Sequence, residues 1–327
     1  SVLAGDGPLT VFAPTNDAFA ASGLDQAALD ALSAADAAQI ITYHAVSGTV
    51  LSSSLSAGVV NTVADLSLVV GTEGGVTLNG GNAVTGGATV TSADVSADNG
   101  VVHVIDRVLL PPTVADLARY AGLTELGAAV EAAGLTETLS GEGPFTVFAP
   151  TNDAFPDDTA GLNVAQVLTY HVLSGAVASD QVTSGNVDTL ATQSFGEGDA
   201  ASSISLDLFI DTSAGVRLNN TADVVIADVR GTNGIVHVID GVLVPLNIAE
   251  VATVAGFTQL VAAVGASAPI PAALAGGDSD VPVIEALSSL SALTVFAPTD
   301  DAFGAAFPGG LPTDQAAVLG VLGGHVV

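Results

Sequence analysis

The stretch from Thr10 to Phe19 reads TVFAPTNDAF, and it decides the fold because the chain uses it three times. Thr146–Phe155 repeats it letter for letter, and Thr294–Phe303 reads TVFAPTDDAF. In each copy the β-branched and aromatic residues favour a buried strand, and the proline ends that strand because it cannot donate to a ladder. The Thr and Asn that follow are typical helix N-caps. The block therefore predicts a strand that passes directly into a helix.

Two further blocks recur in the same order along the chain. ITYHAVSG at Ile41–Gly48 returns as LTYHVLSG at Leu168–Gly175, and only its histidine remains in the third copy, as His325. NGVVHVIDRVLLP at Asn99–Pro111 returns as NGIVHVIDGVLVP at Asn233–Pro245. Self-similarity of this kind is the signature of a repeat architecture.

The distance between copies shows what kind of repeat this is. Phe12 and Phe148 lie 136 positions apart, and His103 and His237 lie 134 apart, far more than the roughly 20 to 50 residues of a solenoid repeat. Each copy is therefore expected to fold around a hydrophobic core of its own. The predicted domains are 1–111, 112–245 and 246–327. The first lacks an opening helical part and the third a closing β part, as in a segment of a longer tandem array.

The amino-acid composition excludes several classes of protein. The chain of 327 residues carries 34 Asp and Glu against four Lys and Arg, a formal net charge of −30. We therefore expect no nucleic-acid partner, because phosphate recognition needs basic residues. No stretch offers the roughly 20 consecutive apolar residues of a spanning helix, so we expect no membrane insertion in this segment. With 49% hydrophobic residues, disorder is excluded.

The segment between Asp25 and Val46 predicts two short helices, because its apolar residues recur close to helical spacing, with Ser33 as the cap of the second. Tyr43 and His44 then lie at the C-terminus of that helix, where a tyrosine hydroxyl finds a backbone partner. A lone histidine in such a place is usually structural, so we favour a hydrogen-bonded packing role for the pair. A recognition surface is the alternative, and catalysis is the weakest interpretation.

The second half of each repeat is expected to be β-rich. Residues 76–85 and 216–229 alternate around Asn and Gly turns, as hairpins do. Alternation in the last block places His103 with Ile105 on one face of a strand and Asp106 on the other. Each repeat is therefore predicted to be an α+β unit.

We interpret the repeated motif residues as structural, because caps and first-turn carboxylates account for them without a ligand. Asn16 and Asp17 would be ligands in the functional alternative. The structural set is Phe12, Pro14, Asp17, Phe148, Pro150, Asp153, Phe296, Pro298, Asp301, His103, Asp106, His237 and Asp240.

No catalytic, metal or cofactor motif emerges. The acidic clusters Asp157–Asp158, Asp278/Asp280 and Asp300–Asp301 lack the alternating ligands and central glycine of a calcium loop, so we interpret them as solvated surface. The stretch Gly74–Gly87 does not lead into a helix and is no phosphate cradle. Asn219 opens a formal glycosylation sequon. We expect no catalytic residue, no metal and no cofactor.

Taken together, the ordered blocks TVFAPTNDAF, YH and NG-VHVID resemble the fasciclin-like domain of cell-adhesion and matrix proteins. The resemblance implies a wedge of strands flanked by short helices, an extracellular or cell-surface location and non-enzymatic adhesion. In that family the Tyr-His pair has been linked to receptor binding, which maps to Tyr43 with His44 and Tyr170 with His171. The third copy departs, because Gly324 stands where the tyrosine should be.

Two segments differ in length between the copies, and each difference predicts a change in structure. Only 23 positions separate Phe148 from His171, against 32 from Phe12 to His44, which predicts a shortened helix in the second copy. The third copy inserts a Pro- and Gly-rich loop near 268–281, a candidate contact surface.

The sequence thus predicts a surface-scaffold or adhesion repeat. Its expected partners are other surface or matrix proteins, glycans or copies of itself, with assembly into a filament as one form. The alternative is a carrier of a small apolar ligand such as a carotenoid. The low count of stacking rings, 11 Phe and no Trp, speaks against that alternative.

Overall fold

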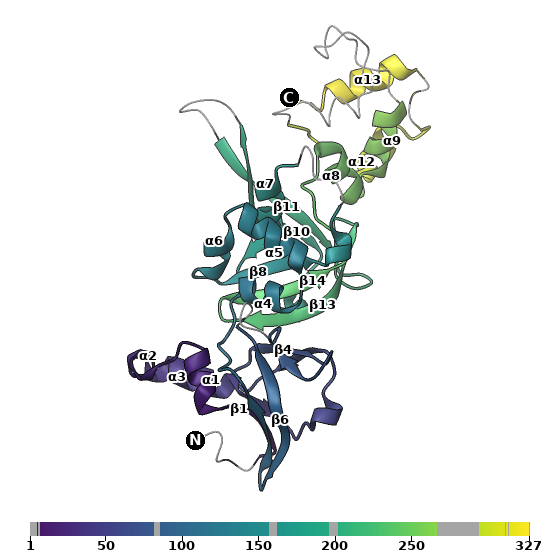
Figure 1. Cartoon of the computed structure of the whole chain (residues 1–327). Helices are drawn as coiled ribbons and strands as arrows, with labels where there is room; N and C mark the ends of the chain where they lie inside the picture. Colours follow the sequence, from purple (N-terminus) through teal and green to yellow (C-terminus); the bar gives the residue numbers. More distant parts are fainter. Residues whose placement is uncertain are drawn as a thin grey trace. The chain divides into compact units, whose positions relative to one another are not determined.

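The computed structural model describes residues 5, 7–81, 86–156, 162–195, 202–266, 294–310, 312 and 314–326 (Figure 1). The chain divides into two compact units, Ser1–Val182 with Ala222–Val242, and Thr183–Thr221 with Leu243–Val327. Below, the three predicted repeats 1–111, 112–245 and 246–327 are called modules 1, 2 and 3.

Module 1 is a seven-stranded sheet with three short helices. Its strand order is β2-β1-β7-β6-β5-β4-β3. The elements are β1 (Leu9–Pro14), α1 (Asn16–Ala21), α2 (Gln26–Ala31), α3 (Ala34–Tyr43), β2 (Ala45–Ser47), β3 (Gly58–Asn61), β4 (Ser67–Gly71), β5 (Thr77–Leu78), β6 (Ala88–Ala97) and β7 (Gly100–Ile105), with a 3-10 turn at Ser52–Ser54.

Local chemistry explains where the helices of module 1 begin. Thr15 caps α1 by accepting a hydrogen bond from the Ala18 amide, and Ser33 caps α3 by accepting one from the Asp36 amide. Both caps satisfy backbone donors that the first helical turn leaves free. In module 1 the strand-to-helix switch and the capping role of Ser33 are as predicted, whereas in module 2 the strand passes into a 3-10 turn and Thr151 makes no side-chain cap bond.

The first and last repeated blocks are neighbouring parallel strands. In module 1, β1 pairs with β7 so that Phe12 lies opposite His103. In module 2, β8 (Phe145–Pro150) pairs with β14 (Gly234–Ile239) so that Phe148 lies opposite His237. The two ring pairs have centroid distances of 5.5 and 5.6 Å. Modules 1 and 2 thus share this parallel pair.

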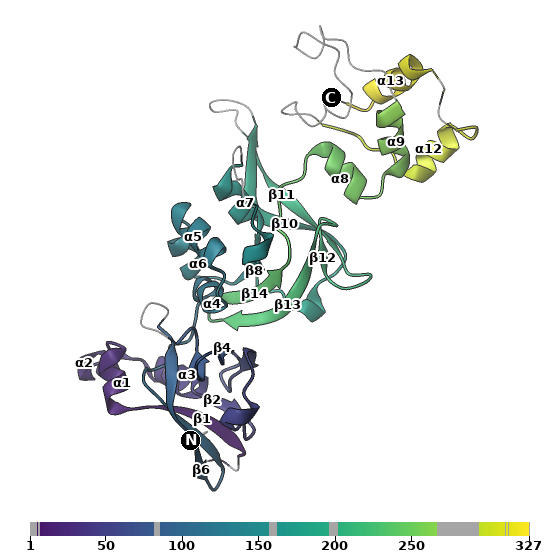
Figure 2. The same ribbon diagram turned by 45° about the vertical axis from the view of Figure 1, so that its right-hand side comes forward.

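Module 2 opens with three helices that have no counterpart among the described residues of module 1, α4 (Val114–Tyr120), α5 (Thr124–Ala132) and α6 (Thr136–Ser140). Figure 2 shows them gathered on one side of the module. They share a core with the sheet: the buried cluster includes Val114, Leu126, Val147, Leu168 and Val236.

The remaining strands of module 2 match those of module 1. In one compact unit the order is β13 (Ala222–Gly231), β14, β8 and β9 (Val172–Ser174), and in the other it is β10 (Gly185–Phe195), β11 (Ser202–Asp211) and β12 (Arg217–Leu218). Modules 1 and 2 are therefore α+β, each a β-sheet flanked by short helices, as predicted.

The helix before the Tyr-His pair is shorter in module 2. There α7 (Val164–Tyr170) has seven residues, whereas α3 has ten. After β8 the described residues hold only a 3-10 turn at Asn152–Ala154 in the place of α1. The shorter spacing from Phe148 to His171 thus removes helix, as the sequence predicts, and keeps the strand and the pair.

Module 3 is described in two parts. It contains α8 (Ile248–Val254), α9 (Thr258–Ala266), α12 (Asp300–Ala306), α13 (Gln315–Gly323) and an isolated antiparallel bridge between Val295 and Val326. The predicted insertion at 268–281, and the clusters Asp157–Asp158 and Asp278/Asp280, lie outside the described residues. Across the described ranges, no helix is long and apolar enough to cross a bilayer.

A close backbone approach explains the glycine of the Asn-Gly block. A Cβ on Gly234 would lie 2.2 Å from the Phe145 carbonyl oxygen, and one on Gly100 would lie 1.8 Å from that of Leu9. In both modules the obstacle is the backbone of the paired parallel strand. Only a residue without a side chain can begin this strand.

We predict that Gly234→Ala lowers the free energy of unfolding by about 1–3 kcal/mol, the usual cost of overpacking. The matched control is Gly127→Ala, where a new Cβ meets no atom within 4 Å. Because Gly127 lies inside α5, this control should be neutral or stabilising by up to about 1 kcal/mol. Denaturant unfolding of both variants checks the prediction, and equal stabilities would contradict it.

Candidate functional site

The Tyr-His pairs lie in the interior. Tyr43 is the last residue of α3 and His44 caps that helix, and Tyr170 and His171 stand in the same places on α7. The exposed fractions are 0% and 6% for the first pair and 0% and 2% for the second. These four side chains present almost no surface to a partner protein. Receptor binding by them stays a prediction.

Hydrogen bonds hold His44 as a neutral imidazole. Its Nδ1 donates to the Ile40 carbonyl oxygen at 2.7 Å, and its Nε2 accepts from the Leu109 amide at 3.0 Å. Burial lowers the pKa of His44, because a charged ring would lose its water, and this outweighs the hydrogen bond to the Ile40 carbonyl oxygen, which acts in the opposite direction. The ring therefore ties the end of α3 to the chain that follows β7.

His171 repeats this arrangement in module 2. Its Nδ1 donates to the Val167 carbonyl oxygen at 2.7 Å, one helical turn earlier, as in module 1. Burial lowers the pKa of His171 to about 4. His171 is therefore poorly suited to proton transfer near neutral pH, because an efficient acid or base titrates near the working pH.

The tyrosine of module 1 is also held by internal hydrogen bonds. The Tyr43 hydroxyl donates to the Ser67 carbonyl oxygen and accepts from Asn79 Nδ2, both at 2.9 Å. Burial raises the pKa of Tyr43 above its usual range. The neutral phenol thus joins α3 to β4 and to the turn after β5, where Asn79 has a φ of +52°, a conformation that asparagine tolerates.

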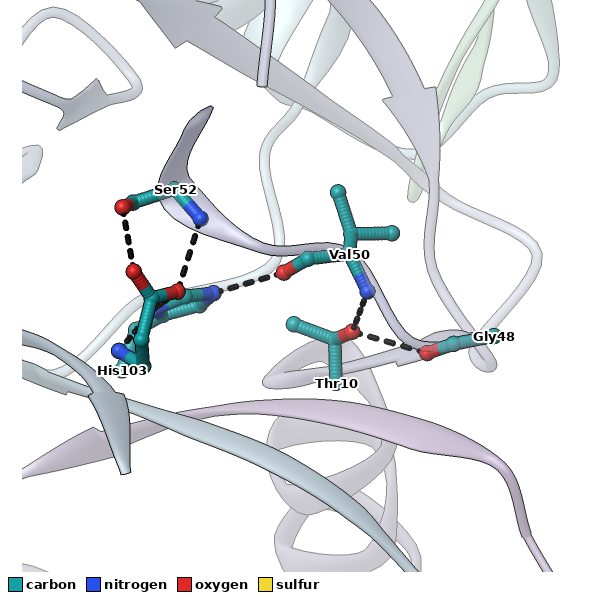
Figure 3. A network of polar contacts seen from close by, with 6 residues as sticks. Thr10, Gly48, Val50, Ser52 and His103 are labelled. Carbon is teal, nitrogen blue, oxygen red and sulfur yellow. Dashed lines mark hydrogen bonds and ion pairs between the residues drawn. The ribbon is translucent and has the colours of Figure 1, made fainter. Parts of the chain in front are cut away.

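A second polar network surrounds the histidine of the last block (Figure 3). The Thr10 hydroxyl donates to the Gly48 carbonyl oxygen at 2.7 Å and accepts from the Val50 amide at 2.8 Å. The Val50 carbonyl oxygen in turn accepts from His103 Nε2 at 2.9 Å. Thr10 and His103 are both 0% exposed, so β1 and β7 together hold the loop that follows β2.

The same histidine also fixes a bulge in β6. The Asp94 amide donates to His103 Nδ1 at 3.2 Å, at a point where the β6–β7 register shifts and Asp94 has a φ of +61°. The Asp94 carboxylate accepts from the Ser52 amide and hydroxyl at 2.8 and 2.6 Å. These bonds from Ser52, the hydroxyl first, lower the pKa of Asp94.

Module 2 repeats the network residue by residue. The Thr146 hydroxyl donates to the Gly175 carbonyl oxygen at 2.7 Å and accepts from the Val177 amide at 2.9 Å. His237 Nε2 donates to the Val177 carbonyl oxygen at 3.0 Å, and its Nδ1 accepts from the Asp228 amide at 3.2 Å. The Asp228 carboxylate accepts from the Ser179 amide and hydroxyl at 2.8 and 2.5 Å. Burial opposes ionisation of Asp228, but the two bonds from Ser179 outweigh it and lower its pKa.

Sequence reasoning missed the threonine, serine and bulge aspartate of this network. One signal was available: Ala-Asp-Val stands at 93–95 and again at 227–229, each time with Asn-Gly starting five residues after the aspartate. An aspartate inside a strand disfavours regular pairing. Its recurrence at a fixed distance from a turn therefore marks a bulge.

The other predicted motif residues fall into two groups. Asp106 accepts from the Thr89 amide at 2.6 Å and Asp240 from the Asp223 amide at 2.7 Å, so each fastens the two strands of a hairpin. Pro14 and Pro150 end β1 and β8. The exposed residues at or near helix starts are Asp17, Asp153 and Asp301, while Pro298 is half-buried and Phe296 is exposed.

The formal sequon has no accessible acceptor. Asn219 is 2% exposed, and its Oδ1 accepts from the Phe209 amide at 3.1 Å. It has a φ of +49° and Asn220 one of +56°, the two positive values of a type I′ turn. The side chain builds the turn and faces the interior.

Neither a metal site nor an unsatisfied polar group is found within the described ranges. There, no three His, Cys, Asp or Glu side chains gather as metal ligands, and every buried side-chain nitrogen or oxygen has a partner. Asp300, from one predicted acidic cluster, accepts from the Thr258 hydroxyl and the Gln259 amide. That carboxylate joins α12 to α9.

Two hollows lie beside the opening helices. In module 2 a hollow of about 600 Å³ is lined by α4, α5 and β8, with His171 in its wall. In module 3 a hollow of about 390 Å³ is lined by α8, α9 and residues 294–297, with His325 in its wall. Equivalent elements build both hollows, and the linings are mainly apolar.

One polar contact joins modules 1 and 2. Arg230 donates from its guanidinium to Asp65 at 2.7 Å and from its amide to the Ser67 hydroxyl at 2.8 Å. Ser67 is the residue whose carbonyl oxygen Tyr43 holds. The ion pair is exposed and worth about 1 kcal/mol or less.

The comparisons with known proteins agree with the repeated blocks. The family model described as Fasciclin domain matches residues 1–111 and 121–245. The chain belongs to the fasciclin domain family. Similar proteins include Protein sll1483 of Synechocystis sp., 44% identical over 131 residues (37% of this chain, 66% of that protein), and Transforming growth factor-beta-induced protein ig-h3 of Sus scrofa, 29% identical over 263 residues (74% and 35%).

Periostin of Homo sapiens is 30% identical over 194 residues, which is 57% of this chain and 22% of periostin. The chain thus spans 66% or less of the length of each of these three relatives. A solved FAS1 domain pair from the insect cell adhesion molecule Fasciclin I is similar over 72% of this chain and 88% of that one, with 22% identity and a TM-score of 0.42.

We predict that His171 titrates with a midpoint near pH 4 and His44 below 6.5, because burial disfavours both charged rings. Between pH 6.5 and 4 the unfolded chain binds a proton at His171 that the folded chain does not. The free energy of unfolding therefore falls as the pH drops through that window, by roughly 3 kcal/mol from His171. Imidazole NMR titration measures the midpoints, and values near 6.5 would contradict the tautomers described above.

We also predict that Thr146→Val destabilises module 2 by about 1–3 kcal/mol, because it removes one donor and leaves the Val177 amide without its acceptor. Thr169→Val is the matched control, since that hydroxyl bonds only to carbonyls of its own helix. The control should change stability by about 0.5 kcal/mol or less. Thermal unfolding compares the two, and an equal loss would argue against the network.

Proposed function

We propose that this chain is a non-enzymatic adhesion or matrix protein that works outside the cell or at its surface. Its partners would be other surface or matrix proteins, glycans or further copies of the chain. The main observation behind this proposal is that equivalent polar residues of modules 1 and 2 form the same hydrogen bonds inside each module. The repeated residues would then maintain the fold of each module as a scaffold. Membership of the fasciclin family supports a role in adhesion.

The outer surface then carries recognition. A formal net charge of −30 gives the scaffold a negative field, which attracts cationic partners and weakens with salt. Single contacts of this kind are modest, but tandem modules raise the effective concentration of each further contact. We infer that the chain binds by avidity, and a filament of such chains is the extended form of this proposal.

The alternative, a carrier of a small apolar ligand, has one observation in its favour. The hollow of about 600 Å³ in module 2 lies in the size range of ligand pockets, roughly 300–1,000 Å³. The alternative predicts that protein purified from its natural source carries an extractable apolar molecule. A pigment such as a carotenoid would show as visible absorption.

The adhesion proposal is tested by coating beads with the chain and measuring their binding to immobilised matrix proteins, glycans and the chain itself. We predict binding that grows steeply with coating density and falls at least tenfold between 50 mM and 500 mM NaCl. A soluble single chain should bind far more weakly than coated beads. The absence of binding to every surface, at low salt and full coating, would overturn the proposal.

A variant tests whether partners bind to the outer surface or to the Tyr-His pair. Tyr43→Phe removes the hydroxyl bonded to Ser67 and Asn79, so we predict a lower melting temperature with bead binding within about twofold of the wild type when both are folded. Tyr120→Phe is the control, because it deletes a hydroxyl from a partly buried tyrosine of α4. A tenfold loss of binding at unchanged stability would instead assign recognition to Tyr43.

A further inference from the structure

The hollow of module 2 lies among core side chains. Leu126, Phe148 and Val172 line it, and they are 4%, 1% and 3% exposed. The other lining residues come from α4, α5, α6, β8 and α7 and include His171. Packed interiors leave few voids larger than a water molecule. An opening of about 600 Å³ among buried side chains is therefore room for a ligand.

The lining suits a hydrocarbon chain. It consists mainly of Val, Leu and Ala side chains, and His171 Nδ1 in its wall donates to the Val167 carbonyl oxygen. Between 112 and 195 the described ranges omit only 157–161, whose sequence DDTAG brings no large apolar side chain. A methylene is about as large as a water molecule in the liquid, roughly 30 Å³, so the hollow has room for a chain of about 12–16 carbons.

A basic residue lines the same hollow. The chain has only four Lys and Arg, and one of them, Arg119 in the last turn of α4, belongs to this lining. Its side chain is 48% exposed, and one guanidinium nitrogen donates to Asp116 at 3.1 Å. A guanidinium carries five N–H donors in a planar fork that matches a carboxylate. Arg119 can therefore hold a second carboxylate where the hollow meets solvent.

Helix α5 reinforces this end of the hollow. It begins at Thr124, which also belongs to the lining, and the positive end of a helix dipole favours an anion there. The acidic lining residue, Glu131, lies in the last turn of the same helix, about 10 Å further along its axis. The charges of the lining thus favour an anionic group beside Arg119 and Thr124.

We propose that module 2 binds a fatty acid in this hollow. Its hydrocarbon tail lies among Leu126, Val147 and Leu168, and its carboxylate lies on Arg119. Burial of the tail supplies affinity, and the charged hydrogen bonds to the guanidinium select an acid over a neutral molecule of the same shape.

This inference goes beyond the adhesion proposal, which assigns recognition to the outer surface. It gives the hollow an amphiphilic ligand in place of a purely apolar one. Its test uses a soluble ligand and no beads, so fatty-acid binding can fail while adhesion persists, and the reverse.

The experiment titrates the delipidated full chain with dodecanoate, below the concentration at which dodecanoate forms micelles, in a calorimeter. We expect saturable binding with one site per chain. The neutral probe 1-dodecanol should bind at least tenfold more weakly, because it offers no charge to Arg119. The absence of dodecanoate binding, or equal affinities for the two probes, would overturn the proposal.

Three variants test the position of the head group. Arg119→Gln should weaken dodecanoate binding at least tenfold and leave 1-dodecanol binding within twofold of the wild type. Arg107→Gln is the matched control, because that guanidinium donates to the Ala21 carbonyl oxygen in module 1, and it should bind both probes as the wild type does. Glu131→Gln should bind dodecanoate at least as tightly as the wild type. Equal losses in the two arginine variants would contradict the assignment to Arg119.

A fourth variant tests the position of the tail. Gly127 lines the hollow, and a new Cβ on it meets no atom within 4 Å, so Gly127→Leu should fold and place its side chain in the open space. We expect both probes to bind at least tenfold more weakly, with a melting temperature no lower than that of the wild type. Unchanged binding of dodecanoate to this variant would place the ligand elsewhere and overturn the proposal.

Discussion

The fold depends on one parallel pairing, that of the TVFAP strand with the NG-VHVID strand. It brings together residues about ninety positions apart and lays a histidine ring beside a phenylalanine, at 5.5 Å in module 1 and 5.6 Å in module 2. The histidine then uses both ring nitrogens, one on the loop after the second strand and one on the bulge of the next strand. A single side chain thus joins four parts of the sheet.

This constraint places the rings of Phe12 and His103, and those of Phe148 and His237, inside their modules. Buried polar groups are costly unless their bonds are complete, and in the described residues they are complete. The Tyr-His pair obeys the same rule as the Phe-His pair, because His44 holds the Leu109 amide and Tyr43 holds Ser67. The proposed recognition is then left to the acidic exterior.

The sequence predicted what depends on neighbours along the chain. The caps at Thr15 and Ser33, the two helices before His44 and the shared face of His103 and Ile105 follow from local periodicity and cap chemistry. The parallel register and the bonds of Thr10 and Asp94 could not be predicted, because their partners lie about 40 positions away or sit on a bulge without a periodic pattern. Phe296 shares its motif with Phe12 and Phe148 yet is 63% exposed, so the motif alone does not determine burial.

Hydrogen exchange of the TVFAP amides tests this account most directly, because three copies of one sequence differ in their pairing. The amides of Phe12 and Phe148 should exchange only when their modules unfold. The amide of Phe296, whose strand makes an isolated bridge and no parallel pairing among the described residues, should exchange at least a hundredfold faster. Protection of Phe296 equal to that of Phe148, in the isolated monomeric chain, would contradict the claim that the parallel strand closes each module.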